Sequence, residues 1–353
     1  TEKRAFPALP VAGSFRSIDF ALSSMSNSHI QTVAVLTQYN ARSLNEHLSS
    51  SKWWNFGRKQ GGLFLFTPTV TADNSDWYRG TADAMYQNID FLKRRHEPYV
   101  IISSGDCVYK LDFNRVLDFH IEKKSDITVV CKDMMYNDDV SRFGVVRMDD
   151  ESRITEFDEK PIEALSNTIS TGIYVIRRRQ LIELLEAAAE ENRFDFVNDI
   201  LVRYKNVKKI YGYKINSYWN NIADIDAYFK TNMDFLRPDV RSYFFREEPT
   251  ICSKVDDLPP AKFNPGSDIS NSLVSSGCII NGSVEDSVLF KQVFVGKNTT
   301  VKNCVILNDV YIGDNVHLEN CIVESRGTIN PNTCYCGEDG VMIVKEKNVR
   351  YVI

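Results

Sequence analysis

The chain has 353 residues, of which 43% are apolar and 25% are charged, and its formal net charge is -5. This is the composition of a globular protein with room for two separate cores. The small negative charge argues against a nucleic-acid partner, and no apolar run is long enough to span a membrane.

Eight cysteines are scattered through apolar or strand-like stretches of the chain. The one close pair, Cys334 and Cys336, lacks a second pair at the spacing of a zinc site. We therefore expect buried, reduced thiols in a cytoplasmic protein. No signal peptide is recognisable, and because the chain starts at Thr1 instead of methionine we expect its start to be truncated.

Helical and strand-like patterns alternate through the first part of the chain. The expected helices are 17–25, 43–48, 80–95, 113–122 and 180–190. The expected strands are 32–37, 63–66, 99–102, 126–131, 144–147, 154–159 and 171–176. Strands that alternate with helices are typical of an α/β fold, in which a mostly parallel sheet is covered on both faces.

A short polar stretch with Ser104, Gly105 and Asp106 follows the expected strand 99–102. A carboxylate just past the C-terminal end of a strand lies where open α/β sheets bind ligands. The small residues before it allow a large ligand to approach the backbone. Asp106 is therefore a candidate metal ligand in a nucleotide site, and the alternative is that it caps a turn.

The pattern changes after residue 236. Five prolines mark 237–265 as an irregular connector. Beyond it, aliphatic residues recur in steps of six with slips of one. This hexapeptide period is typical of a parallel β-helix, and the alternative is an irregular all-β domain. We expect an α/β domain over 1–236, the connector, and a β-helix over 266–353.

Six motifs occur in order along nearly the whole chain: WYRGTADA (77–84), SGD (104–106), FDEKP (157–161), STGIY (170–174), LPPAKF (258–263) and NSLVSSGC (271–278). Together they resemble the ADP-glucose pyrophosphorylase (glucose-1-phosphate adenylyltransferase) family, most closely its regulatory GlgD-type subunit. The resemblance implies a Rossmann-like, GT-A-like nucleotidyltransferase sheet followed by a left-handed parallel β-helix.

The resemblance also implies a reaction. In that family, glucose 1-phosphate attacks the α-phosphate of ATP in the presence of Mg²⁺, and ADP-glucose and diphosphate are formed for glycogen or starch synthesis. Such chemistry depends on positioning and charge neutralisation. The family's Gly-rich phosphate loop precedes a K-P-A-V-P segment that matches 6–10 here. We therefore expect the loop and its strand to lie before Thr1.

Two positions depart from the family's catalytic pattern. Phe6 stands where the family has a phosphate-facing Lys, and Asn221 stands where it has the second magnesium-binding Asp. Removing one electrostatic contact to a transition state commonly costs about 10²–10³ in rate. We therefore assign no catalytic residue, retain Asp106 as the metal ligand, and keep Asp224 as an alternative second ligand.

The substrate-binding positions are retained. The resemblance implies that Glu159, Lys160 and Ser170 contact glucose 1-phosphate, and the alternative for the first two is an exposed ion pair. Gln38 matches a residue near the adenine pocket, and the alternative is a solvated strand end.

The first turn of the expected helix 80–95 is a further candidate. Gly80, Thr81 and Asp83 could present N–H groups to a nucleotide, and the alternative is plain helix capping by Thr81. Lys3 and Arg4 match a basic pair whose lysine contacts the sugar-phosphate effector, and the alternative is a solvated pair of charges.

These observations predict a regulatory chain that has lost most or all activity and joins a catalytic paralogue in a hetero-tetramer, with ATP, ADP-glucose, glucose 1-phosphate or effectors as ligands. A first alternative is an active homotetramer that uses Mg²⁺, Asp106 and Asp224. A remote alternative is a β-helix acyltransferase that uses His317, for which no partner acid is assured.

Overall fold

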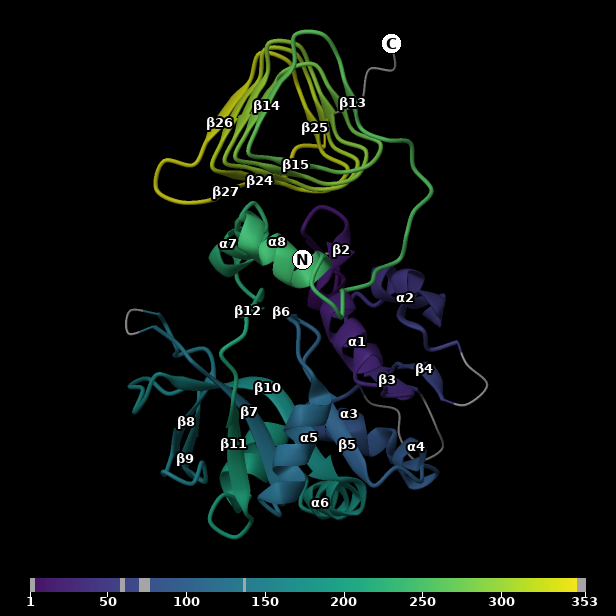
Figure 1. Ribbon diagram of the computed structural model, residues 1–353, viewed down its shortest axis with the longest axis vertical. Coiled ribbons are helices and arrows are strands. Elements are labelled where there is room, and N and C mark those ends of the chain that lie inside the picture. The colour runs from purple at the N-terminus through teal and green to yellow at the C-terminus, as the bar shows by residue number, and fades with distance from the viewer. Residues whose placement is uncertain (1–3, 58–60, 70–76, 136–137, 348–353) are drawn as a thin grey trace. The chain divides into compact units, whose positions relative to one another are not determined.

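A computed structural model describes residues 4–57, 61–69, 77–135 and 138–347 (Figure 1). The chain forms two compact units, each built from separate stretches. The solenoid unit comprises Thr1–Ser23, Gly105–Lys110 and Asn220–Ile353, and the sheet unit comprises Ser24–Ser104 and Leu111–Trp219. Among the described residues, no helix is both long and apolar enough to cross a membrane.

The sheet unit contains a six-stranded sheet in the order β11-β7-β10-β8-β9, with β5 also paired to β10. Four of these strands, β5, β7, β8 and β11, share one direction, which confirms the mostly parallel α/β fold, whereas β9 and β10 run the other way. A separate parallel pair is formed by β3 and β4. The bounds are β3 (Thr32–Leu36), β4 (Gly62–Phe66), β5 (Tyr99–Ser103), β7 (Ile127–Asp133), β8 (Gly144–Met148), β9 (Ile154–Glu159), β10 (Thr168–Arg177) and β11 (Ile210–Lys214).

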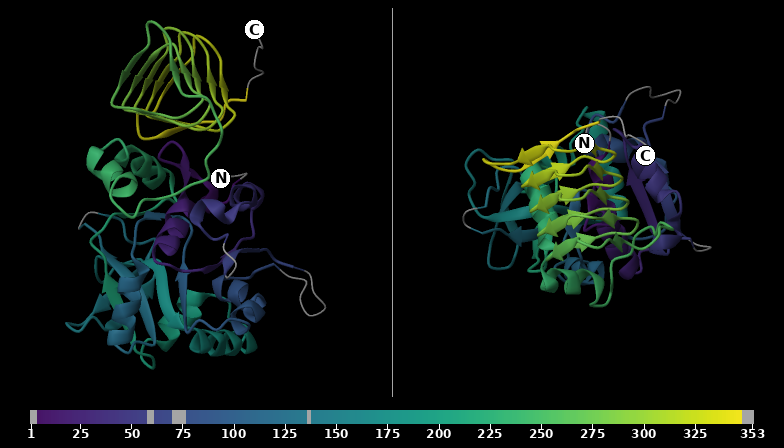
Figure 2. Two further views of the ribbon diagram at one scale, coloured as in Figure 1. Left: turned by 45° about the vertical axis from the view of Figure 1, so that its right-hand side comes forward. Right: turned by 90° about the horizontal axis from the view of Figure 1, so that it is seen from above.

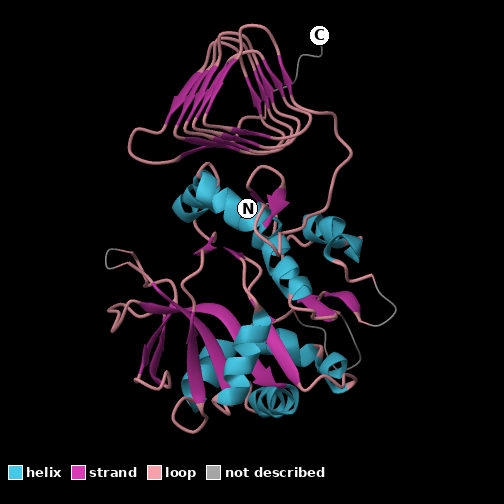
Figure 3. Cartoon of the chain, in the orientation of Figure 1, coloured by secondary structure: helices cyan, strands magenta, loops and turns pink. Residues whose placement is uncertain are grey.

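Helices cover both faces of this sheet, as Figure 3 shows in cyan. On one face of β7, the buried Ile127 and Val129 share a core with Leu181 of α6. On the other face, Thr128 Oγ1 lies 2.8 Å from Nδ1 of His120 in α5. The helices are α1 (Ser17–Asn27, which begins in the solenoid unit), α2 (Arg42–Leu48), α3 (Thr81–Gln87), α4 (Ile89–Lys93), α5 (Phe113–Glu122), α6 (Arg178–Glu190) and the π-helix η3 (Val197–Val202), with short 3-10 turns at η1 (Phe6–Ala8) and η2 (Ser51–Trp54).

The predicted helix 80–95 is interrupted. Asn88 leaves the helical conformation, with φ -109° and ψ 23°, and separates α3 from α4. Its side-chain Nδ2 donates to the hydroxyl of Tyr78 and to the carbonyl of Ala84, both at 2.9 Å. An Asn side chain that bonds its own backbone competes with the helix, which accounts for the break.

The solenoid unit ends in a parallel β-helix of three five-stranded faces, seen as triangular coils in Figure 1 and as stacked rungs in Figure 2. The first face holds β13 (Lys262–Phe263), β16 (Ile279–Ile280), β19 (Phe294–Val295), β22 (Tyr311–Ile312) and β25 (Thr328–Ile329). The second holds β14 (Asp268–Ser270), β17 (Ser283–Glu285), β20 (Thr300–Lys302), β23 (His317–Glu319) and β26 (Cys334–Cys336). The third holds β15 (Leu273–Val274), β18 (Val288–Leu289), β21 (Val305–Ile306), β24 (Cys321–Val323) and β27 (Met342–Val344).

The hexapeptide pattern correctly predicted this core. Val301, Ile306, Ile312 and Leu318 point inward and are fully buried. Side chains one coil apart, such as the hydrogen-bonded Asn amides at one corner, stand 17 residues apart. In the middle of the β-helix one coil therefore takes two steps of six and one of five, which explains the slips in the period.

The expected irregular connector 237–265 is partly regular. The structure places α8 (Pro238–Phe245) at its start and β13 near its end. We interpreted Pro238 as a mark of irregular chain, but proline is well tolerated in the first turn of a helix, where the backbone N–H has no intrahelical partner. The β-helix accordingly begins at Lys262, a few residues before the predicted start.

The rest of the solenoid unit joins distant parts of the sequence. Its elements are β1 (Pro10–Val11), β2 (Phe15–Arg16), β6 (Cys107–Tyr109), β12 (Trp219–Asn221, whose first residue belongs to the sheet unit), α7 (Ile225–Asp234) and α8. The Tyr228 hydroxyl in α7 donates to the carbonyl of Pro10 at 2.6 Å, and the Ala12 N–H donates to Asn232 Oδ1 at 3.1 Å. These buried bonds fix the start of the described chain against α7.

Gly296 tests how tightly the coils stack. A methyl group at this position would lie 2.4 Å from the carbonyl oxygen of Gly313 in the next coil. Because that oxygen is a backbone atom that already accepts the Thr299 hydroxyl at 2.7 Å, Gly296→Ala should lower the free energy of unfolding by about 1–3 kcal/mol, measured by urea denaturation. Lys297→Ala, at an exposed neighbouring position, is the control, and equal losses in both variants would contradict the clash.

Candidate functional site

Glu159 and Lys160 lie at the end of β9, in the sheet unit. Gly144 of β8 stands opposite Glu159 and leaves room for its carboxylate, since a methyl group there would lie 2.9 Å from Oε2. Burial raises the pKa of the Glu159 carboxyl, opposed by the Lys160 ammonium and reinforced by Asp195. The Lys160 side chain is 66% exposed, and its ammonium lies 3.9 Å from Glu159 Oε1. The carboxylate could therefore accept hydrogen bonds from sugar hydroxyls, and the ammonium could bind a phosphate.

Ser170 belongs to the same cluster. It is 6% exposed in β10, and its hydroxyl donates to the Tyr174 hydroxyl at 3.2 Å. The pairing of β10 with β7 shifts register between these two residues, and Gly172, at φ +73°, forms the bulge. Burial and the charge of Glu159 raise the pKa of Tyr174, although the Ser170 hydrogen bond opposes them.

Sequence reasoning missed Tyr174 and Asp195 as members of this cluster. Tyr174 lies within the quoted STGIY motif, so its position in the sequence was available. Asp195 gave no signal, because it comes from a loop before η3 and belongs with Glu159 only through the fold. We call Glu159, Lys160, Ser170, Tyr174 and Asp195 the sugar cluster.

Gln38 holds a backbone segment. Its Nε2 donates to the Tyr78 carbonyl at 3.2 Å, and its Oε1 accepts the Tyr78 N–H at 2.6 Å. Beside it, the rings of Tyr39 and Trp77 stack at 5.7 Å with an interplanar angle of 9°, and both are mostly exposed. Both polar atoms of the Gln38 side chain thus bond the backbone of the WYRGTADA segment, next to the stacked rings of Tyr39 and Trp77.

Residues 80–83, whose N–H groups were expected to face a nucleotide, include two whose N–H groups have partners within the chain. The N–H groups of Ala82 and Asp83 both donate to the carbonyl of Phe194, at 2.8 and 3.2 Å. Thr81 does not cap the helix either, because Gly80 is the N-cap and the Thr81 hydroxyl accepts the Phe196 N–H at 2.9 Å. A distant segment therefore caps α3.

The side chain of Asp83 is structural. It is 3% exposed and accepts hydrogen bonds from the Arg79 N–H at 2.9 Å, from Arg79 Nη2 through its second oxygen at 2.9 Å, and from Gln87 Nε2 at 2.9 Å. Burial alone would raise its pKa, but the bonds and charge of Arg79 outweigh burial and hold the pKa of Asp83 below its usual value.

The two departures from the family pattern gather around Asp106, all within the solenoid unit. The Ser17 hydroxyl lies 2.8 Å from the Gly105 carbonyl and 3.3 Å from that of Phe6, so Phe6 begins its 3-10 turn beside the Asp106 segment. Asn221 lies in β12, which pairs with β6 in a two-stranded sheet. Its Nδ2 lies 3.5 Å from Sγ of Cys107, the residue after Asp106. The side chain of Phe6 is uncharged, so it brings no positive charge to the Asp106 segment.

The described residues around Asp106 do not fit a magnesium site with two carboxylates. Asn221 Oδ1 accepts the Ala223 N–H at 2.9 Å, an Asx turn that engages the one oxygen the amide could offer a metal. Asp224 Oδ1 accepts the Ala227 N–H at 2.7 Å and caps α7. Mg²⁺ prefers carboxylate and phosphate oxygens in a near-ideal octahedron, and Asp106 supplies one carboxylate.

The predicted effector pair is described in part. Lys3 lies outside the described residues. Burial lowers the pKa of the Arg4 guanidinium, with Tyr228, Arg326 and Glu324 as its charged or polar neighbours. Arg4 is therefore half-buried beside the β-helix instead of lying in a solvated tail.

Comparisons with known proteins agree with this architecture. A nucleotidyl transferase family model matches residues 1–237, and a GlmU-like C-terminal hexapeptide model matches residues 259–344. A glucose-1-phosphate adenylyltransferase of Pseudothermotoga lettingae is 39% identical over 304 residues, which are 85% of this chain and 72% of the relative. Proteins of the same name from Clostridium novyi and Bacillus subtilis are 38% and 36% identical over 85% of this chain, covering 79% and 80% of the relatives.

The sheet unit and the stacked coils, with the matches to both parts, define a nucleotidyltransferase with a C-terminal hexapeptide-repeat domain. The relatives that are 36–39% identical in sequence are all named glucose-1-phosphate adenylyltransferase, which identifies the family within this class. The chain belongs to the glucose-1-phosphate adenylyltransferase family.

Proposed function

We propose that this chain is a non-catalytic or weakly catalytic regulatory subunit of a glucose-1-phosphate adenylyltransferase in glycogen biosynthesis, of the GlgD type. In this proposal it joins a catalytic paralogue in a hetero-tetramer and changes the rate or the effector response of that enzyme. The observation that carries the proposal is the group of Phe6, Asp106 and Asn221, in which one carboxylate remains where the family has two and a ring replaces a cation.

The charge balance of this group supports low turnover. A nucleotidyl transfer builds negative charge on the phosphates, and catalysis comes mostly from cations placed where that charge develops. Phe6 supplies no positive charge, and Asn221 supplies a neutral oxygen that already accepts the Ala223 N–H. Asp224, the alternative second ligand, already uses one of its two carboxylate oxygens to cap α7.

The sugar cluster supports ligand binding without turnover. Glu159, Lys160 and Ser170 are the residues that the family motifs have at these positions, and they lie together in the sheet unit. A ligand that binds without reacting can shift a conformational equilibrium by its differential affinity for two states. Arg4, beside Glu324 and Arg326, is the described part of the proposed effector site.

The test compares three samples: the full chain alone, its candidate catalytic paralogue alone, and the two mixed at equal concentration. Diphosphate release from ATP and glucose 1-phosphate is measured with Mg²⁺, and assembly is followed by light scattering. We expect background release by this chain alone, a mixed assembly, and altered kinetics in the mixture. Robust turnover by this chain alone would overturn the proposal in favour of an active homotetramer, and independent behaviour of the two proteins would overturn the partnership.

Lys160 tests the sugar cluster directly. Replacing Lys160 with alanine should weaken binding of glucose 1-phosphate by about 10–100-fold, because a hydrogen bond to a charged group contributes about 1.5–3 kcal/mol. Isothermal titration calorimetry measures the change. Lys124→Ala is a matched control, since both lysines are exposed and both have positive φ, 50° at Lys160 and 48° at Lys124. An unchanged affinity in Lys160→Ala would remove this residue from the site.

A further inference from the structure

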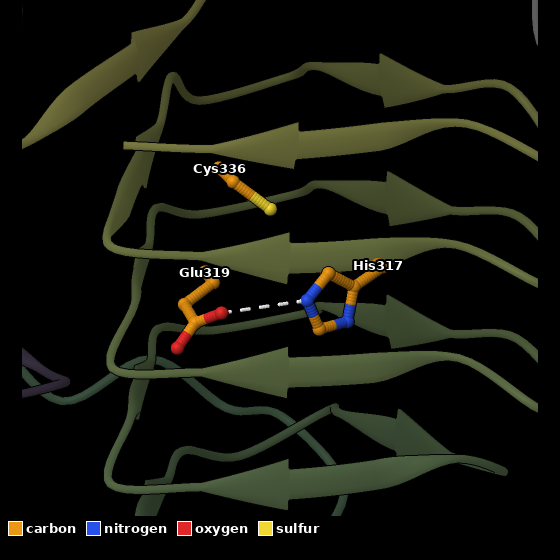
Figure 4. Close-up of side chains that lie close together, drawn as sticks. All are labelled: His317, Glu319 and Cys336. Atoms are coloured by element: carbon orange, nitrogen blue, oxygen red, sulfur yellow. Dashed lines mark ion pairs between the residues drawn. The ribbon is translucent and has the colours of Figure 1, made fainter. Parts of the chain in front are cut away.

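Four side chains of metal-binding type share the outer surface of two neighbouring strands in the last coils of the β-helix. His317 and Glu319 lie on β23, and Cys334 and Cys336 lie on β26. The strands pair in parallel, with His317 opposite Cys334 and Glu319 opposite Cys336. The residue between each pair packs into the β-helix core, so alternate side chains face outward. Figure 4 shows His317, Glu319 and Cys336 pointing toward one another.

The distances within this cluster are those of a metal site. His317 Nε2 lies 3.5 Å from Glu319 Oε2, and the sulfurs of Cys334 and Cys336 lie 3.6 Å apart. The ligand atoms of His317, Glu319 and Cys336 all lie within 4.8 Å of one another. Tetrahedral zinc, with bonds of about 2.3 Å to sulfur and about 2.0 Å to nitrogen or oxygen, separates two sulfurs by about 3.8 Å and a nitrogen from an oxygen by about 3.3 Å. Three ligands are thus in place, and rotation of the Cys334 side chain, whose sulfur lies 3.6 Å from that of Cys336, would bring in the fourth.

The surroundings leave the cluster open to an ion. The side chains of His317 and Glu319 are 43% and 38% exposed. In the preceding coil, Lys302 stands opposite Glu319, but its ammonium lies 3.6 Å from Glu285 Oε2 on the far side. Thr300, opposite His317, is neutral. The Lys302 ammonium is thus paired with another carboxylate.

We propose that His317, Glu319, Cys334 and Cys336 bind one divalent transition-metal ion, with Zn²⁺ as the preferred ion. Two thiolates and an imidazole select zinc over Mg²⁺ or Ca²⁺, which take oxygen ligands. The ion would join β23 to β26, the last strand of its face, and would fasten the terminal coil. This site is separate from the sugar cluster and does not depend on the proposed regulatory function.

The experiment uses the full chain, stripped of metal and kept reduced with a phosphine. It is titrated with Co²⁺, and Zn²⁺ affinity is measured by competition with a chromophoric chelator. We expect one equivalent of Co²⁺ with thiolate-to-cobalt charge-transfer bands and the ligand-field bands of a tetrahedral ion. Zn²⁺ should displace the cobalt and raise the midpoint of thermal unfolding.

Variants separate the site from adventitious binding. The double variant Cys334→Ser, Cys336→Ser should bind Zn²⁺ at least about 100-fold more weakly, because loss of an outer-shell partner alone costs 10–100-fold. Cys252→Ser, at another exposed cysteine, is the control and should bind as the wild type does. Equal Zn²⁺ affinity in the double variant, or cobalt spectra without charge-transfer bands in the wild type, would overturn the proposal.

Discussion

Replacing Asn221 with aspartate and Phe6 with lysine in one protein should raise magnesium-dependent diphosphate release by at least about 10²–10³-fold over the wild type. The first change restores a carboxylate beside Asp106, and the second restores a cation next to the Gly105 segment. Each supplies charge that the transition state of a nucleotidyl transfer requires. The measurement is the initial rate of diphosphate release by the chain alone, from ATP and glucose 1-phosphate.

A matched control places the same charge one residue away. Asn220→Asp adds a carboxylate where the amide donates to Asp234 Oδ2 at 3.3 Å, so we expect no gain in rate. The single variants Asn221→Asp and Phe6→Lys show whether the two gains are independent, since groups that act as a unit are not additive. A wild type that already turns over as fast as the double variant would contradict this explanation.

The second large effect concerns the stability of the sheet unit. Asp83→Ala should lower the free energy of unfolding by about 2–4 kcal/mol at neutral pH, because it removes the buried acceptor that binds Arg79 and Gln87. Urea denaturation followed by circular dichroism measures the loss. Asp90→Asn is the control: Asp90 is 77% exposed and lies 3.8 Å from Arg94, so its replacement should change the free energy by less than about 0.5 kcal/mol.

Asp83 also makes the free energy of unfolding depend on pH. The pKa of Asp83 is held below its usual value in the folded protein, so ionised Asp83 stabilises the fold. This contribution is fully present above the unfolded pKa of about 3.9 and is lost as the pH falls through the lower folded value. Asp83→Asn should therefore flatten the stability curve at acid pH. A curve with the wild-type slope would show that other carboxyl groups carry the acid transition.

The sequence was most informative where a local pattern decides the structure. The helix 113–122 was predicted with its observed bounds, because Asp112 accepts the Asn114 N–H and caps it. The inward aliphatic residues of the β-helix were predicted for a similar reason, since each coil repeats the same local geometry. The family motifs singled out Glu159, Lys160 and Ser170, and their role in binding a sugar phosphate stays a prediction.

Sequence reasoning failed where the partner is remote in the chain. The carbonyl that caps α3 belongs to Phe194, more than a hundred residues after Gly80, and no local pattern points to it. Cys334 and Cys336 were interpreted as buried thiols without a second ligand pair, but neither is buried. Their partners stand one coil earlier, at 17 residues, a spacing that has meaning only once the coils are stacked.

The solenoid unit is built from three stretches that are far apart in the sequence, so it cannot be completed until the last of them has been synthesised. The stretch Thr1–Ser23 is synthesised before the helix that holds Pro10 and Ala12, which belongs to the stretch Asn220–Ile353. At about 5–20 residues per second, the early stretch waits roughly 10–40 s for its partner. Through that interval the sheet unit can fold while Pro10 and Ala12 lack their partners in α7, a period in which a chaperone has access to this stretch.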